Sequence, residues 1–133
     1  MTIANGVPAL AALAAALLGD ESARKDAAAI TARLGVTGLE PAPAGFLTVD
    51  PAPGCSLLEV DVDDGVVRAV VLQLSEPVPL RGLADRLGPW EDASLFSHAV
   101  HIRQVRFFPP GAQVVATLDD TGRAATAVLV SPA

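Results

Sequence analysis

The chain has 133 residues, of which 51% are hydrophobic, so it is long enough to bury one core and too apolar to be intrinsically disordered. Nine basic residues stand against fifteen acidic ones, and this net charge of −6 has the wrong sign for binding a phosphate backbone or an anionic lipid surface. We therefore expect neither nucleic acid nor membrane as a partner.

The first apolar run, from Val7 to Gly19, predicts a buried helix over residues 8–18. Pro8 suits the first helical turn, and Gly19 suits the position just after the helix. Ala and Leu surround the whole helix, which is typical of a helix buried in the fold or packed against a second copy of the chain. The run resembles the apolar part of a signal peptide, but no Lys or Arg precedes it.

A second helix is predicted to follow directly, capped by Asp20 or Ser22 and closed by Gly35. Its apolar residues recur at spacings of four, three and four, which makes one stripe along the helix. The stripe consists of Ala23, Ala27, Ile30 and Leu34.

The next segment, residues 36–55, is rich in proline and glycine, which leaves room only for a short strand over 46–49. Residues 56–62 then alternate between apolar and other side chains, so they predict a strand with Glu59 and Asp61 on its outer face.

A tight acidic hairpin turn at residues 63–65 predicts a return strand over 66–74. A third helix is expected from Pro79 to Leu87, followed by a loop that contains Trp90 and Phe96. The chain then predicts three more strands. They are expected around residues 98–108, 113–118 and 123–130.

The two halves of the chain have prolines, turn residues and helix ends at matching positions. Residues 46–77 align with residues 102–133, and the alignment pairs Pro53 with Pro109 and the acidic turn at 63–64 with the one at 119–120. The same Arg-Leu-Gly sequence ends the second and the third helix. Because the helix end, the turn and the hairpin recur in one order, we predict a duplication. Its units are residues 21–77 and 78–133, with the helix over 8–18 as an addition.

The predicted unit is a helix, a long loop and three strands joined by tight turns. This order resembles the helix-plus-meander unit of the outer-membrane assembly lipoprotein BamE (SmpA) and its tandem form in β-lactamase inhibitory proteins. Residues 78–133 match it best, with a helix that ends in Arg86-Leu87-Gly88-Pro89. The lipidated cysteine of the former and the cysteine pairs of the latter are missing. The resemblance implies an α+β fold: two tandem α-β-β-β units in a mostly antiparallel sheet with helices on one face.

No candidate site for catalysis, metal or nucleotide has the required spacing. Residues 61–65 resemble part of a calcium loop, but Gly65 is fifth where sixth is needed, and Leu72 occupies the position of the bidentate Glu. His98 and His101 point to opposite faces of a strand, so they are badly placed to share a metal. We therefore expect no enzyme activity, no cofactor and no metal.

Cys55 is the only cysteine, which rules out an internal disulfide and fits a cytoplasmic protein. A reactive thiol is one interpretation of Cys55, but a small buried hydrophobe is the favoured one.

These patterns favour a non-enzymatic protein-binding module of the inhibitor, immunity or adaptor type, which uses the open sheet face and the aromatic loop. Its acidic surface fits a partner with a basic one. Two alternatives stay open: a small-ligand or enzymatic pocket between sheet and helices, and a structural homodimer through the helix over 8–18. The candidate binding residues are Glu59, Asp61, Trp90, Phe96, His101 and Arg103.

Overall fold

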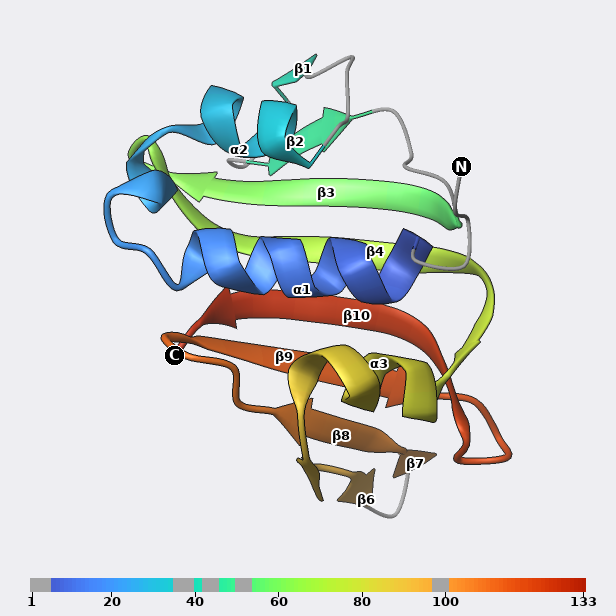
Figure 1. The fold of residues 1–133 in the computed structure, drawn as a ribbon. Helices are drawn as coiled ribbons and strands as arrows, with labels where there is room; N and C mark the ends of the chain where they lie inside the picture. The colour runs from blue at the N-terminus through green and yellow to red at the C-terminus, as the bar shows by residue number, and fades with distance from the viewer. Residues whose placement is uncertain (1–5, 35–39, 42–45, 50–53, 97–100) are drawn as a thin grey trace.

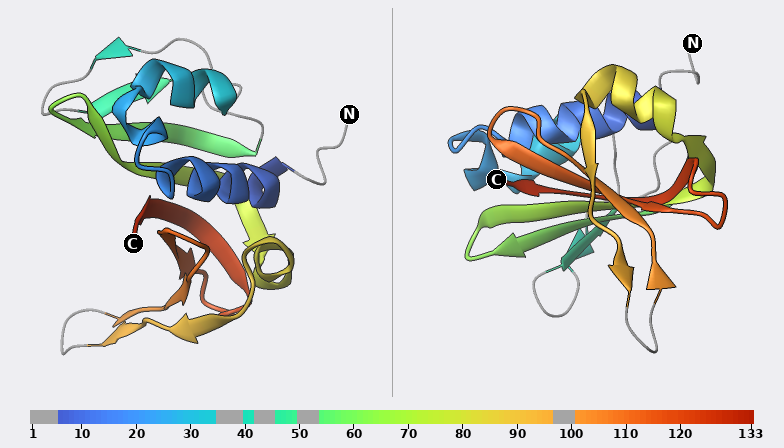
Figure 2. Two further views of the ribbon diagram at one scale, coloured as in Figure 1. Left: turned by 60° about the vertical axis from the view of Figure 1, so that its left-hand side comes forward. Right: turned by 90° about the horizontal axis from the view of Figure 1, so that it is seen from below.

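The structure is a computed structural model, which describes residues 6–34, 40–41, 46–49, 54–96 and 101–133. These residues form an α+β fold, as predicted, in which the helices lie on one face of an antiparallel sheet (Figures 1 and 2). The opposite face of the sheet carries no helix in the described part of the chain, and we call it the open face.

The helices are α1 (Gly6–Leu18), the 3₁₀ helix η2 (Ala23–Lys25), α2 (Ala27–Arg33) and α3 (Leu80–Leu87). The strands are β1 (Glu40–Pro41), β2 (Phe46–Val49), β3 (Cys55–Asp63), β4 (Val66–Pro79), β5 (Trp90–Asp92), β6 (Leu95–Phe96), β7 (His101–Ile102), β8 (Gln104–Phe107), β9 (Ala112–Leu118) and β10 (Ala124–Pro132).

Eight of these strands form one sheet in the order β1-β2-β3-β4-β10-β9-β8-β5, and β6 pairs with β7 in a small separate hairpin. Every pairing between described strands is antiparallel. Strands β2 to β4 make one meander and β8 to β10 make another. The two meanders join at the centre of the sheet, where their last strands, β4 and β10, pair with each other.

The core lies between the helices and the sheet. Helix α1 lies over the central strands β4 and β10, roughly along their direction, and also contacts α3 (Figure 1). Seven of its thirteen residues are buried, so its apolar composition serves packing within the fold. Most of the buried core side chains are aliphatic, and the largest fully buried side chain is that of Phe107 on β8. No helix in the described part of the chain is long and apolar enough to cross a membrane.

The second predicted helix is wrong as one continuous element. The chain forms η2, leaves helical geometry at Asp26 (φ −132°) and starts again as α2. The physical reason is that the Asp26 carboxylate accepts a hydrogen bond from the Ala29 amide at 3.0 Å, which caps α2 instead of continuing the helix. The predicted apolar stripe survives the break, because Ile30 and Leu34 are buried and Ala23 and Ala27 pack against the core.

The predicted loop after α3 is also wrong in part. Its first residues form β5, which pairs with β8 along the edge of the sheet, and β6 follows. The predicted strand around 98–108 is interrupted at Arg103 between β7 and β8, and its residues 98–100 lie outside the described residues. The hairpin turn at Asp64 and Gly65 is confirmed, since both residues have positive φ, 53° and 77°.

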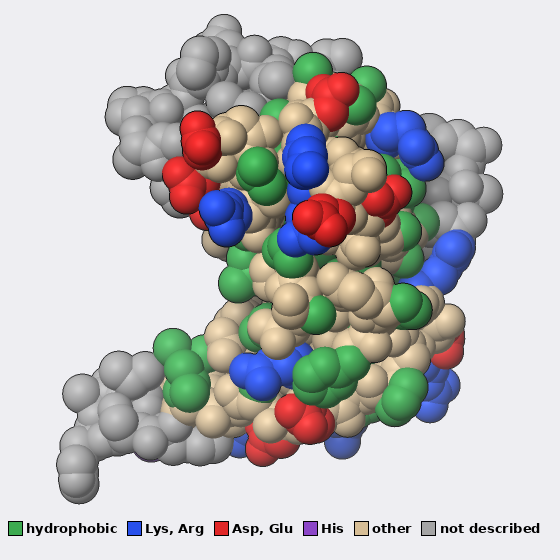
Figure 3. Space-filling model, turned by 90° about the vertical axis from the view of Figure 1, so that its left-hand side faces the viewer, with side chains coloured by type: hydrophobic (Ala, Val, Ile, Leu, Met, Phe, Trp, Pro, Cys, Tyr) green, Lys and Arg blue, Asp and Glu red, His purple; other side chains and the backbone are tan. Residues whose placement is uncertain are grey.

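The sheet is curved across its strands, and both sides of it bend towards the open face (Figure 2). Seen from the side, the molecule is hollowed there (Figure 3). The open face is therefore concave, and its floor is formed by the central strands β4, β10 and β9.

Candidate functional site

One row of side chains crosses the open face at right angles to the strands. Each member is the direct cross-strand neighbour of the next, from β3 to β5. Cross-strand neighbours project from the same face of a sheet, and the residues on either side of them along β3, β4, β10, β9 and β8 are buried beneath the helices. We call this set the central row. It consists of Glu59, Val71, Leu129, Val115, Arg106 and Glu91.

The middle of the central row is apolar and reaches solvent. Leu129 is 39% exposed at the centre of the sheet, and its neighbours Val71 and Val115 are half-buried. The next row along the strands is mixed, since Gln73 and Thr117 flank Ala127. The open face therefore has a small aliphatic centre within a polar surround, which is typical of a contact surface on a soluble protein.

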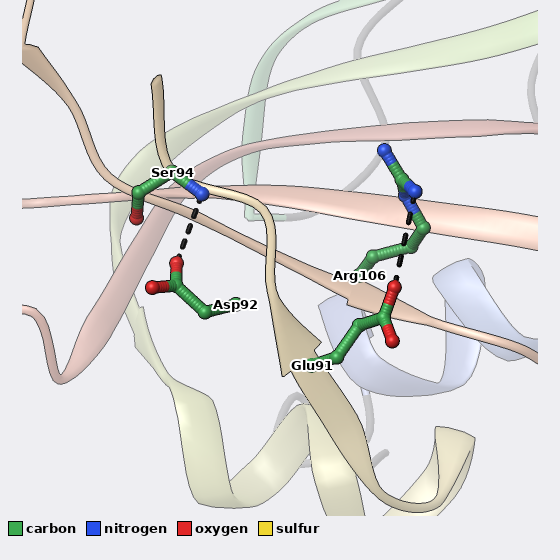
Figure 4. Close-up of polar contacts among 4 residues, drawn as sticks. All are labelled: Glu91, Asp92, Ser94 and Arg106. Carbon is green, nitrogen blue, oxygen red and sulfur yellow. Dashed lines mark hydrogen bonds and ion pairs between the residues drawn. The ribbon is translucent and has the colours of Figure 1, made fainter. Parts of the chain in front are cut away.

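The two ends of the central row differ in charge. At the β5 end, Arg106 forms an ion pair with Glu91, with 3.9 Å between Nη1 and Oε1 (Figure 4). At the β3 end, neither Glu59 nor Asp61 has an ion-pair partner among the described residues. The β3 side of the hollow is thus an acidic wall, whereas the β8 side is already neutralised.

The structure separates the residues that were predicted to form one binding surface. Glu59 and Asp61 project from the open face, next to Leu58 and Val60, which are fully buried on the other side. Trp90 belongs to the helix-bearing side, because it lies directly opposite Phe107. Its ring centroid is 6.1 Å from that of Phe107, and it stays 45% exposed at the sheet edge.

His101 and Arg103 lie together in a third place. With Leu118, Asp119 and Asp120 they line a shallow pocket of about 250 Å³ at the ends of β7 and β9. His101 and Arg103 therefore adjoin acidic residues, and they are not brought to Glu59 and Asp61. Phe96 pairs with His101 in the β6–β7 register.

The aliphatic centre of the site was missed by sequence reasoning. Val71 was placed in a strand and Leu129 in another, but neither was singled out. A usable signal was present, because Val70 and Leu72 alternate with Val71, so one of the two sets must face outwards. What the sequence could not show is that β4 pairs with β10, which brings Val71 and Leu129 together.

The acidic turn that was predicted before the last strand forms a small hydrogen-bonded unit. The Asp119 carboxylate accepts hydrogen bonds from the Thr121 hydroxyl at 2.6 Å and the Thr121 amide at 3.1 Å. The Thr121 hydroxyl is the main reason why the pKa of Asp119 lies below its usual range. The turn thus has a structural role that needs no bound ion.

A pH dependence follows from this turn. The pKa of Asp119 is lower in the folded protein than in the unfolded chain, so the ionised carboxylate stabilises the fold. This stabilisation is fully present above the unfolded-state pKa, and it is lost as the pH falls through the folded-state pKa. We expect Thr121→Val to raise the Asp119 titration midpoint, measured by NMR of the carboxyl carbon. Thr126→Val, which removes a hydroxyl bonded to Thr117 instead, should leave that midpoint unchanged. An unchanged midpoint in Thr121→Val would contradict this account.

A second cavity, of about 480 Å³, lies where the start of α1 meets the end of β4 and the start of α3. Glycine, proline and valine make up most of its lining, and Ser75 and Glu76 supply its polar side chains. Neither Cys55 nor His101 lines it. Cys55 is buried and free, and burial raises the pKa of its thiol, which fits the predicted hydrophobic role and makes the nucleophilic thiolate scarcer.

Within the described ranges, no three His, Cys, Asp or Glu residues are grouped so that they could hold a metal ion. His98 lies outside those ranges.

No family model and no curated protein matches this sequence. Among solved structures, the fold is similar to a DUF4309 family protein (YjgB) from Bacillus subtilis subsp. subtilis str. 168. The TM-score is 0.52 at 10% identity, over 81% of this chain and 78% of that one. A cysteine-rich secretory protein (SAV1118) from Staphylococcus aureus subsp. aureus Mu50 has a TM-score of 0.47 at 11% identity, over 81% of this chain and 44% of that one.

At such identities the first likeness speaks for the fold alone. The similarity to BamE and to β-lactamase inhibitory proteins stays a prediction.

Proposed function

We propose that this protein is a non-enzymatic binding module that holds a protein partner against its open face. One observation carries the proposal: an exposed aliphatic centre, Leu129 with Val71 and Val115, lies at the floor of a concave surface that no described helix covers. Central apolar contacts surrounded by polar groups are where binding energy concentrates in protein interfaces.

The charge of the site supports a basic partner. Glu59 and Asp61 form no ion pair with another described residue, and the whole chain carries a net charge of −6. A positively charged surface would be attracted to this wall before contact and oriented by it, which raises the association rate. The single buried cysteine is compatible with our proposal of a cytoplasmic location.

We also propose that the two meanders arose by duplication, and the strand register supports it. Val49 pairs with Leu58, and Leu58 with Leu72; in the second meander Val105 pairs with Ala116, and Ala116 with Val128. The outer strands thus correspond at the predicted offset of 56, whereas the middle strand is displaced by two residues. A displacement by two keeps every side chain on its own face, so both copies contribute to the same open face.

The helix α1 is a weaker surface for a homodimer. Its leucines other than Leu13 are buried in the fold. Its outer side presents a stripe that includes Ala12, Leu13 and Ala16, of which Ala12 and Leu13 still pack partly against the core. This stripe is narrow, whereas a standard interface buries about 800 Å² on each partner.

Site-specific photo-crosslinking in the native host tests the proposal. A photoreactive residue at Gln73, exposed on the open face, should capture one protein species, and the same residue at Asp85, exposed on α3, should not. Leu129→Asp should abolish the capture while a thermal melt confirms folding, and Leu129→Ile should retain it. Equal capture from both positions, or none from Gln73, would contradict the proposed function.

A further inference from the structure

The backbone of the open face is already satisfied, which limits what can bind there. Strands β4, β10 and β9 each have a hydrogen-bonded neighbour on both sides, and Val71, Leu129 and Val115 lie in regular register, so at the central row they offer an occupant side chains and not an unpaired strand edge. An extended segment laid on this floor would leave its own amides and carbonyls without partners where water is excluded. A helix satisfies these groups internally, so it can be buried on the floor at no such cost.

The shape of the open face also favours a helix as its occupant. The hollow runs along the strands, because the sheet bends across them (Figures 2 and 3). Two concave faces of identical chains would meet only at their rims, which argues against a symmetric dimer through this surface. From β3 to β8 the sheet spans four strand spacings, about 19 Å, and a helix with its side chains is about 10–12 Å wide. One helix therefore fits between the two walls.

The side chains define the chemistry of that helix. The floor residues Val71, Leu129 and Val115 are aliphatic, so the helix that packs on them needs an apolar stripe. The acidic wall, Glu59 and Asp61, calls for Lys or Arg along one flank of the stripe. The opposite wall needs no charge, since Arg106 is already paired with Glu91.

We infer that the partner docks by an amphipathic helix that lies along the strands, with its apolar stripe on Leu129 and its basic flank towards Glu59 and Asp61. This inference rests on the proposed function and deepens it by naming the partner element. It follows that binding depends on whether the partner segment is helical and on the sign of the charge along its flank.

Synthetic peptides supply the probe. A peptide of about 18 residues makes a helix of about 27 Å, close to the length of the floor strands β9 and β10, which have seven and nine residues. The probe has a Leu stripe at helical spacing and Lys along one flank. One comparison peptide alternates Leu and Lys and so favours an extended strand, and another carries Glu in place of Lys.

In NMR spectra of the ¹⁵N-labelled protein, the helical Lys probe should shift the amides of Val71, Leu129 and Val115. The extended peptide should not shift them. Glu59→Lys should weaken binding of the Lys probe by about fivefold or more and strengthen binding of the Glu probe. Glu21→Lys, the same substitution in the exposed turn after α1, should change neither affinity beyond the screened effect of net charge.

Three results would overturn the inference. The extended peptide could shift the same amides as strongly, the helical probe could leave them unmoved, or the free protein could shift them with its own concentration because a second copy occupies the face. If capture from Gln73 persists in any of these cases, the open face binds a protein and only the helix is wrong. If crosslinking from Gln73 is absent as well, both the helix inference and the proposed function are wrong.

Discussion

Phe107→Ala should lower the free energy of unfolding by about 3–5 kcal/mol. Phe107 is the largest fully buried side chain in the described core, and it lies on β8 beneath the helices. The substitution loses the favourable free energy of burying a phenyl ring away from water. It also leaves a cavity that the surrounding β-sheet can close only in part. Urea unfolding followed by far-ultraviolet circular dichroism measures the loss.

The neighbouring phenylalanine provides the control. Phe108 is 55% exposed, and Phe108→Ala should change the free energy of unfolding by no more than about 0.5 kcal/mol. Tryptophan fluorescence is the wrong probe for this pair, because Trp90 contacts the Phe107 ring directly. Similar losses for the two variants would mean that the core is not where the structure puts it.

These two residues also show how far sequence reasoning extends. Period-two counting along the predicted strand around 98–108 places Val105 and Phe107 with His101 and Arg103 on one face, and Arg106 with Phe108 on the other. Within β8 the structure keeps that division, since Val105 and Phe107 are buried and Arg106 is not. Alternation is a property of the strand itself, so it can be predicted from a few consecutive residues. The hairpin at Asp64 and Gly65 was predictable for the same reason, since its signal is local.

What depends on distant parts of the chain was not predictable. Trp90 was expected in a loop, but it forms an edge strand because β8 offers free backbone groups beside it. The acids Glu59 and Asp61 were identified correctly as outward residues of β3. The aliphatic centre was not identified, because it exists only through the pairing of β4 with β10, and neither strand encodes its neighbour.

Gly111→Ala should be the other strongly destabilising change, by about 3 kcal/mol. Gly111 has a φ of +71°, and an added Cβ would lie 2.7 Å from the carbonyl oxygen of Gly19. Two costs therefore combine: a left-handed conformation that L-residues disfavour, and a clash with backbone that cannot rotate away. Thermal and urea unfolding of the purified variant measure the sum.

Two further glycines separate these costs. Gly65→Ala carries only the conformational one, about 1 kcal/mol, since its φ is +77° and nothing lies within 4 Å of the added Cβ. Gly19→Ala carries the steric one, because its Cβ would lie 2.6 Å from the carbonyl oxygen of Pro110. If Gly111→Ala proves as stable as Gly65→Ala, the close contact between the backbones of Gly111 and Gly19 is absent in solution.

The Gly19–Gly111 contact matters for the site as well as for stability. It fixes the end of α1 against the turn between β8 and β9, so a helix that begins over the first meander is held to the second. If both substitutions disrupt this one contact, the double variant should lose less stability than the two single losses added together. Additive losses would instead mean two independent defects. A shared contact would also predict that either variant weakens binding at the open face, because the hollow depends on how the two meanders are held together.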